Sequence, residues 1–129
     1  GVLAALSALK EDGYRLGICT NKPDAPAKRI CDELDLSGYF DMILGVLPGH
    51  AKKPDAAPLL RCIAALEGTA ETAIYVGDSG VDYETARNAG VPFRLFSGGY
   101  LNADLADFGD VTMFDDWSVQ SIVGDTQAT

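Results

Sequence analysis

The 129-residue chain has few of the residues and segments that mark zinc-binding, disulfide-rich or membrane proteins. It holds one histidine, His50, and three widely spaced cysteines, Cys19, Cys31 and Cys62, with no Cys-x-x-Cys pair. Because these cysteines are odd in number and lie within apolar patterns, they favour reduced core thiols in a cytoplasmic protein. No apolar run approaches the ~18 residues of a membrane span, and no signal peptide is visible.

The overall composition is acidic but otherwise that of a folded domain. The 10 basic residues are outnumbered by 19 acidic ones, so the formal net charge is −9 at pH 7. Without a basic stripe, nucleic acids and anionic membrane surfaces are poor partners, whereas a small phosphorylated metabolite can still bind near a metal ion and a few lysines. The 47% hydrophobic fraction suits one domain, which we expect over residues 1–123, with a polar tail at 124–129.

Apolar periodicity predicts helices and short strands in alternation. That alternation predicts an α/β fold with a Rossmann-like three-layer αβα core and a mostly parallel sheet. In the second helix, Ala27, Ile30 and Leu34 share the face that we expect to be buried. The predicted strands are 14–20, 40–46, 72–76, 93–96 and an edge strand at 111–113, and the predicted helices are 1–12, 23–36, 56–67 and 79–89, with shorter pieces at 102–107 and 117–123.

Residues 74–91 contain the most informative motif. An apolar run ends at Gly77, Asp78 follows at once, and Asp82 comes four residues later in a helix-compatible segment. Residues at i and i+4 lie on one helix face, so both carboxylates can point to one place at the carboxyl edge of a sheet. Mg²⁺ is usually held by one or two carboxylates together with water and phosphate. A plain helix start, capped by Asp78 or Ser79, is the alternative interpretation.

Two further polar clusters fall at the same expected edge. Thr20 and Asn21 follow the first strand, where a hydroxyl, an amide and free N–H groups can hold phosphate oxygens. Lys53 lies in a loop before a helix and can place a positive charge on a phosphate or a carboxylate. The alternatives are an ordinary helix cap and a solvated lysine, and Lys52 leaves the choice of lysine open by one position.

In this order the clusters resemble the second, third and fourth sequence motifs of the haloacid dehalogenase superfamily. The resemblance covers roughly residues 1–115, and segments 16–22 and 98–100 are similar to its phosphoglycolate phosphatase-like subgroup. It implies a Mg²⁺-dependent phosphatase, a phosphoric monoester hydrolase of a small phosphorylated metabolite, with 2-phosphoglycolate as a candidate. The matching segments are Thr20-Asn21, Lys53-Pro54, Val76-Gly77-Asp78-Ser79-x-x-Asp82 and Ala86-x-x-Ala89-Gly90.

The resemblance also implies a role for each matching side chain. Thr20 would bind the transferring phosphoryl group, with Asn21 beside it. Lys53 would stabilise the charge of that group and of the nucleophile, so that Thr20 and Lys53 are the implied catalytic residues. Asp78 would hold Mg²⁺, and Asp82 would support it.

One part of the family pattern is absent from these 129 residues. No Asp-x-Asp, the first motif, which supplies the nucleophile for an aspartyl-phosphate, precedes Thr20, and the helical cap that follows this motif is missing too. The resemblance therefore implies the C-terminal part of such an enzyme, without turnover by itself. In the family the missing strand is central, between the strands that end at Thr20 and Gly77. We therefore expect an incomplete sheet, open to dimerisation or to an N-terminal segment supplied in trans.

Two other functions stay open. A non-catalytic scaffold that binds Mg²⁺ or phosphate would follow from the missing nucleophile. A binding module of the receiver or flavodoxin type is the second, and a receiver needs a phospho-acceptor aspartate on its middle strand. The strands predicted to end at Thr20 and Val46 supply no such acid, which makes this module the less favoured function.

Overall fold

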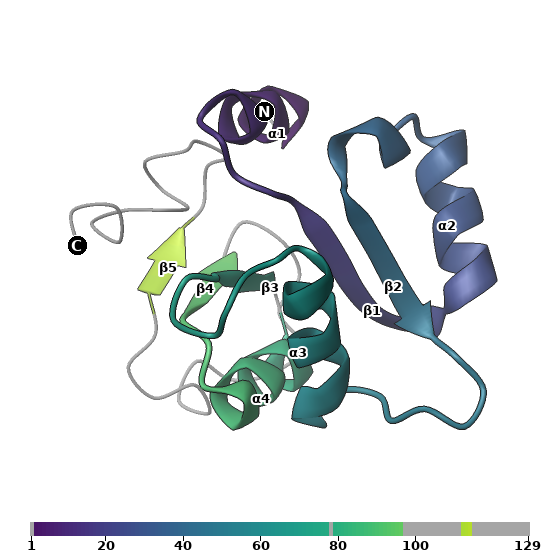
Figure 1. The fold of residues 1–129 in the computed structure, drawn as a ribbon, viewed down its shortest axis with the longest axis vertical. Coiled ribbons are helices and arrows are strands. Elements are labelled where there is room, and N and C mark those ends of the chain that lie inside the picture. The colour runs from purple at the N-terminus through teal and green to yellow at the C-terminus, as the bar shows by residue number, and fades with distance from the viewer. Residues whose placement is uncertain (1, 78, 97–111, 115–129) are drawn as a thin grey trace.

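Helices and strands alternate along the chain, as the sequence predicts (Figure 1). The structure, a computed structural model, describes residues 2–77, 79–96 and 112–114. All the strand pairs in these residues are parallel, which confirms the α/β class. In chain order the elements are α1 (Val2–Glu11), β1 (Gly17–Pro23), α2 (Asp24–Glu33), the 3-10 helix η1 (Ser37–Tyr39), β2 (Met42–Val46), α3 (Ala56–Ala65), β3 (Tyr75–Gly77), α4 (Gly80–Ala89), β4 (Phe93–Phe96) and β5 (Thr112–Phe114).

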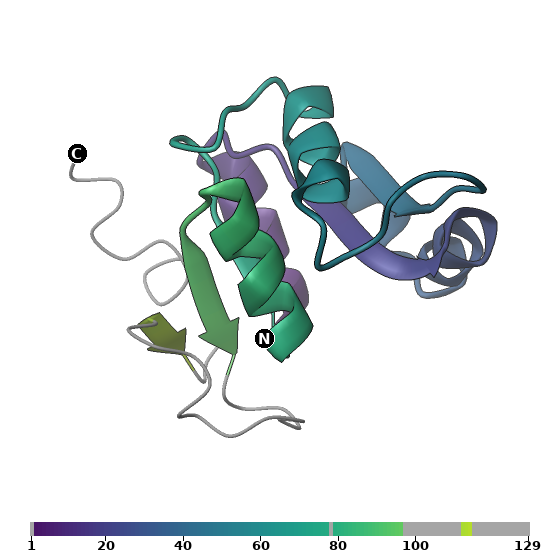
Figure 2. The ribbon, with the colours of Figure 1, turned by 90° about the horizontal axis from the view of Figure 1, so that it is seen from below.

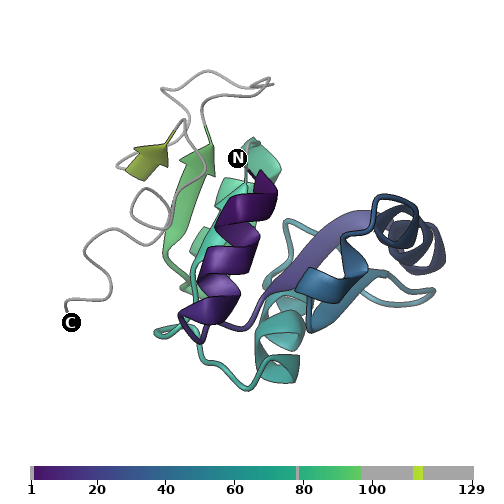
Figure 3. The same ribbon diagram turned by 90° about the horizontal axis from the view of Figure 1, so that it is seen from above.

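The described strands form two sheets instead of one. β1 pairs with β2, and β3, β4 and β5 form the second sheet in that order. Figures 2 and 3 show the β1–β2 pair with α2 on one side of the molecule and the second sheet on the other. In the part of the chain that the structure describes, no ladder joins β1 to β3. The split lies where the resemblance to the family places a missing central strand.

Helices cover both faces of the second sheet, with α1 on one face and α4 on the other (Figures 2 and 3). On the α1 face, Ala5 and Leu9 are buried against a small cluster that includes Val76. On the other face, Tyr75 and the fully buried Leu95 belong to the larger core, to which α3 and α4 contribute. Successive residues of a strand point to opposite faces, so Tyr75 and Val76 of β3 join different clusters. This arrangement confirms the predicted layers.

A cleft of about 1090 Å³ lies between the facing edges of β1 and β3. Much of its wall is apolar, and Ile18 of β1, Val76 of β3 and Leu9 of α1 contribute to it. Lys53 and Asp82 also line the cleft, and we call the part of the cleft that they line its polar end.

β1 begins and ends later than the predicted strand at 14–20. It reaches Pro23, which lies opposite Val46, and its ladder with β2 is irregular between Cys19 and Pro23. Pro23 is also the N-cap residue of α2. Proline lacks an N–H, so it is tolerated both at the end of a strand and at the start of a helix. Pro23 in the sequence therefore did not show where the strand ends and the helix begins.

The prediction for the buried face of α2 holds for Ala27 and is wrong for Ile30 and Leu34. Ile30 and Leu34 are 39% and 61% exposed, whereas Ala27 and Cys31 are buried. The helix lies close to β2, since a Cβ at Gly45 would come within 2.5 Å of a backbone atom of α2. Such an approach favours the face with the smaller side chains, and Leu34 lies beyond the helix as its C-cap residue.

The remaining boundaries differ by a few residues. β3 begins at Tyr75 instead of residue 72, because Thr72 forms a turn in which its hydroxyl accepts the Thr69 N–H at 2.9 Å. The edge strand predicted at 111–113 is confirmed within one residue by β5. None of the helices that the structure describes is long and apolar enough to cross a membrane. Outside the described residues lie the predicted helical pieces at 102–107 and 117–123 and the tail at 124–129.

Candidate active site

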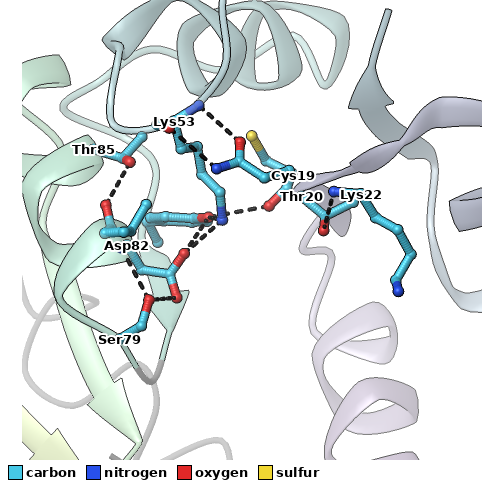
Figure 4. A network of polar contacts seen from close by, with 10 residues as sticks. Cys19, Thr20, Lys22, Lys53, Ser79, Asp82 and Thr85 are labelled. Atoms are coloured by element: carbon cyan, nitrogen blue, oxygen red, sulfur yellow. Dashed lines mark hydrogen bonds and ion pairs between the residues drawn. The ribbon is translucent and has the colours of Figure 1, made fainter. Parts of the chain in front are cut away.

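Side chains from three separate segments and the backbone of a fourth meet at the polar end of the cleft (Figure 4). Lys53 comes from the loop between β2 and α3, Asp82 from the first turn of α4, and Tyr75 from β3. The backbone of Cys19 in β1 completes the group. The carboxyl ends of parallel strands share one edge of a sheet, which is why residues far apart in the sequence converge here.

Lys53 and Asp82 form a buried ion pair. Lys53 Nζ lies 2.6 Å from Asp82 Oδ1, and the two side chains are only 10% and 13% exposed. A charge-assisted hydrogen bond in such surroundings is stronger than one in water. Lys52 is exposed, so the structure places Lys53 and not Lys52 in the site.

The start of α4 holds Asp82 in place. Ser79 is the N-cap residue of α4, and its hydroxyl accepts the Asp82 N–H at 3.3 Å and donates to Asp82 Oδ2 at 2.9 Å. Gly77 leaves room for this carboxylate, because a Cβ there would lie 2.5 Å from the Asp82 Cβ. The predicted helix cap is therefore confirmed at Ser79, and it coexists with a carboxylate that faces the lysine. Asp78 lies outside the described residues.

The side chain of Asn21 holds the backbone of the loop that carries Lys53. The Lys53 N–H donates to Asn21 Oδ1 at 2.8 Å, and Asn21 Nδ2 donates to the Lys53 carbonyl at 3.1 Å. On the other side of the loop, Asn88 Nδ2 donates to the Pro54 carbonyl at 2.9 Å. In this structure the Asn21 amide therefore fixes Lys53, while the phosphate contact implied by the resemblance stays a prediction.

Thr20 lies on the β1 side of the site (Figure 4). Its hydroxyl accepts the Lys22 N–H at 3.2 Å. The N-cap residue of α2 is Pro23, with no side-chain cap bond, so the interpretation of Thr20 and Asn21 as an ordinary helix cap is wrong. The role of Thr20 in phosphate binding stays a prediction.

Tyr75 is a member of the site that sequence reasoning missed. Its hydroxyl oxygen lies 2.9 Å from Lys53 Nζ and 3.1 Å from both Asp82 Oδ1 and the Cys19 carbonyl oxygen. Burial, followed by the charge of Asp82, raises the pKa of Tyr75 well above its ordinary value, so the hydroxyl stays protonated. The one available signal was a tyrosine two residues before Gly77 in an otherwise apolar strand.

The cysteines near the site are neutral thiols. All three cysteines of the chain are free and buried, as the sequence predicts. Burial raises the pKa of Cys62 to about 12 and also raises that of Cys19, although the nearby Lys53 opposes the second shift. Neither of these two cysteines is therefore a thiolate nucleophile at neutral pH.

The carboxylate of Asp82 at this edge is a type of ligand that a hard cation such as Mg²⁺ prefers. Within the described ranges, which omit Asp78, no three histidine, cysteine or acidic side chains come together as a metal cluster. Mg²⁺ needs only one or two carboxylates when water and substrate phosphate complete its shell. Asp82, together with Asp78 four positions earlier in the sequence, is therefore our candidate for the protein ligands, and this role stays a prediction for both residues.

Comparison with known proteins identifies the family. A model described as haloacid dehalogenase-like hydrolase matches residues 1–96. The chain belongs to the haloacid dehalogenase-like hydrolases. Two curated relatives of this chain are named phosphoglycolate phosphatases. The protein of Rhodospirillum rubrum is 42% identical over 121 residues, which cover 92% of this chain and 49% of the relative. The protein of Aquifex aeolicus is 40% identical over 105 residues, which cover 80% and 49%.

A solved structure extends the comparison to the fold. The crystal structure of a predicted phosphoglycolate phosphatase from Haemophilus somnus matches this chain with a TM-score of 0.80 and 31% identity. The match covers 91% of this chain and 52% of that one. The haloacid dehalogenase-like fold is thereby confirmed, and the family match argues against the receiver or flavodoxin alternative. This chain spans about half the length of the relatives that it matches.

Proposed function

We propose that the whole protein is a Mg²⁺-dependent phosphatase of a small phosphorylated metabolite, with 2-phosphoglycolate as the first candidate. The observation that carries this proposal is the buried Lys53–Asp82 pair at the carboxyl edge of the strands, beside Thr20 and Asn21. The substrate class is supported by the curated relatives, which are named phosphoglycolate phosphatases at 42% and 40% identity.

Lys53 supplies positive charge in the proposed reaction. Positioning and electrostatic stabilisation carry most of the catalysis of phosphoryl transfer. The ammonium is only slightly exposed, so its field is weakly screened, and Asn21 and Asp82 hold the backbone and the side chain of this residue in place. The Thr20 hydroxyl, across the site on β1, binds an oxygen of the phosphoryl group in this scheme.

Asp78 and Asp82 are the residues that we propose to hold Mg²⁺. When bound, the ion would neutralise charge on the phosphoryl oxygens. Asp82 Oδ1 already accepts from Lys53 and lies 3.1 Å from the Tyr75 hydroxyl, and Oδ2 accepts from Ser79. Asp78 is therefore the better candidate for direct contact with the ion, with Asp82 in support.

The attacking carboxylate of the proposed aspartyl-phosphate route is not among these 129 residues. We infer that the cleft between β1 and β3 receives the strand that carries it, either from the rest of the whole protein or from another chain. Apolar walls and open strand edges on two sides are what a buried parallel strand requires. In this proposal the 129-residue chain alone has no phosphatase turnover.

A fusion protein tests the proposal. The part of the Rhodospirillum rubrum relative that this chain does not match would be joined to the N-terminus of the chain, and release of phosphate from 2-phosphoglycolate would be measured with and without Mg²⁺. We expect turnover from the fusion with Mg²⁺, none from the 129-residue chain, and a loss of at least ~100-fold in the Lys53→Met fusion.

Each outcome of this assay has a distinct meaning. Turnover by the 129-residue chain that depends on Lys53 would show that the proposed inactivity is wrong. A folded fusion without activity on 2-phosphoglycolate and other small phosphate esters would overturn the proposed phosphatase. If that fusion still bound Mg²⁺ and phosphate in calorimetry, the non-catalytic scaffold would be the better function.

A further inference from the structure

Tyr75 is a polar side chain to which the proposed reaction gives no role. Its hydroxyl contacts Lys53, Asp82 and the Cys19 carbonyl of β1, at distances between 2.9 and 3.1 Å. Lys53 Nζ also lies 5.5 Å from the centroid of the Tyr75 ring, within range of a cation–π interaction. A single side chain thus contacts the lysine, its counter-ion and the neighbouring strand.

The protons set the direction of these hydrogen bonds. An ammonium group only donates, so the phenol oxygen accepts from Lys53. The single hydroxyl proton is then left for Asp82 Oδ1 or for the Cys19 carbonyl oxygen, both 3.1 Å away. Tyr75 therefore links the lysine to either of these two acceptors, or to both through one shared proton, without adding a charge.

We propose that Tyr75 is the positioning residue for Lys53, because its hydroxyl ties the ammonium to the Cys19 carbonyl of β1. A lysine has a long, flexible stem, and a bond to Asp82 alone fixes its ammonium from the α4 side only. The bond through Tyr75 adds a contact from the β1 side. The catalytic meaning of this position rests on the proposed function, whereas the contact itself does not.

The matched variant is Tyr75→Phe. It removes the hydroxyl and keeps the ring, which packs against Phe93 with centroids 6.2 Å apart. Tyr39→Phe is the control, because it removes a hydroxyl from a half-buried tyrosine in η1. Circular dichroism and thermal unfolding would show that both variants are folded.

The first measurement is the rate at which each lysine amine is acetylated in the 129-residue chain, followed by peptide mass spectrometry. Exposed Lys52, next in the sequence, is the internal reference. We expect Tyr75→Phe to raise the Lys53 rate relative to Lys52 roughly threefold or more, as the loss of a hydrogen bond to a charged group would, and Tyr39→Phe to leave the ratio unchanged. An unchanged ratio in Tyr75→Phe would overturn the proposal.

A second measurement needs no variant and covers the case in which Tyr75→Phe fails to fold. In nitrogen-15 NMR spectra of the unmodified chain, the ammonium protons of Lys53 should exchange with water at least ~threefold more slowly than those of Lys52. Equal exchange rates for the two lysines would contradict a fixed ammonium.

The fusion protein provides the catalytic readout. Tyr75→Phe should lower kcat roughly three- to tenfold and leave KM for 2-phosphoglycolate nearly unchanged, since it displaces a charge that acts in the transition state. An unchanged kcat would refute positioning for catalysis. If the unsubstituted fusion has no turnover, the proposed function fails, while the acetylation and NMR results still decide the contact.

Discussion

Replacing Lys53 by methionine removes the ammonium that lies 2.6 Å from Asp82 Oδ1 and keeps an unbranched side chain. Both side chains of the pair are at least 87% buried, since their exposed fractions are 10% and 13%. Breaking a buried pair by removing one partner costs about 3–5 kcal/mol. Asp82 can still accept from the Ser79 and Tyr75 hydroxyls, so we expect a loss at or just below the lower limit of this range, about 2–3 kcal/mol.

Urea denaturation measures this loss. With a slope of about 1.5 kcal/mol per molar urea, the midpoint should fall by roughly 1.3–2 M. Asp82→Asn should have a similar effect, and the double variant should cost about 1–2 kcal/mol less than the sum of the two single variants, because each single change leaves a buried group without its partner. Lys52→Met is the matched control, since that side chain is exposed, and it should stay within about 0.5 kcal/mol of the unmodified chain.

The result that would refute this reasoning is additivity. If the two single losses sum to the loss of the double variant, Lys53 and Asp82 do not interact in the folded chain. A loss below about 0.5 kcal/mol for Lys53→Met would likewise place the ammonium in water rather than in a buried pair.

Two further predictions concern Gly77 and Asp24. Gly77→Ala should destabilise the chain by about 1–3 kcal/mol in urea, because the new Cβ would lie 2.5 Å from the Asp82 Cβ, whereas Gly68→Ala, with its nearest contact at 3.4 Å, should cost less. Equal losses of unfolding free energy in the two glycine variants would contradict this prediction. The bond from Lys28, aided by a backbone N–H, lowers the pKa of Asp24, so its stabilisation is present above the unfolded pKa of about 3.9 and disappears as pH falls through the lower folded pKa. Asp24→Asn should therefore be less stable than the unmodified chain at pH 7 and nearly equal to it near pH 2, and a pH-independent difference between their urea midpoints would contradict this.

The order of elements and the placement of polar residues at one edge could be predicted from sequence, because both depend on local signals. Apolar periodicity marks each helix and strand, and parallel strands bring their ends together wherever they lie in the chain. Lys53 and Asp82 come from loops and helix starts that follow such strands. Their convergence needed no knowledge of side-chain contacts.

The contacts that hold the site could not be predicted, because they join residues far apart in sequence. Tyr75 bonds to the Cys19 carbonyl across 56 positions, and nothing local distinguishes it from a core tyrosine. The buried face of α2 was also missed, since it depends on the close approach at Gly45 rather than on the helix itself. The volume of the side chains that must fit against the neighbouring strand decides which face of α2 is buried. Apolar periodicity carries no information about that volume.

The double hydrogen bond between Asn21 and Lys53 closes a loop of 32 positions in the chain. A carboxamide that both donates to and accepts from one residue reproduces the pairing of two peptide groups, so it fixes the distance between Asn21 of β1 and the lysine directly. The cost of closing a flexible loop grows only slowly with its length. Insertions around η1, on this account, would leave the lysine where it is, and this part of the chain can vary in length while the site keeps its dimensions.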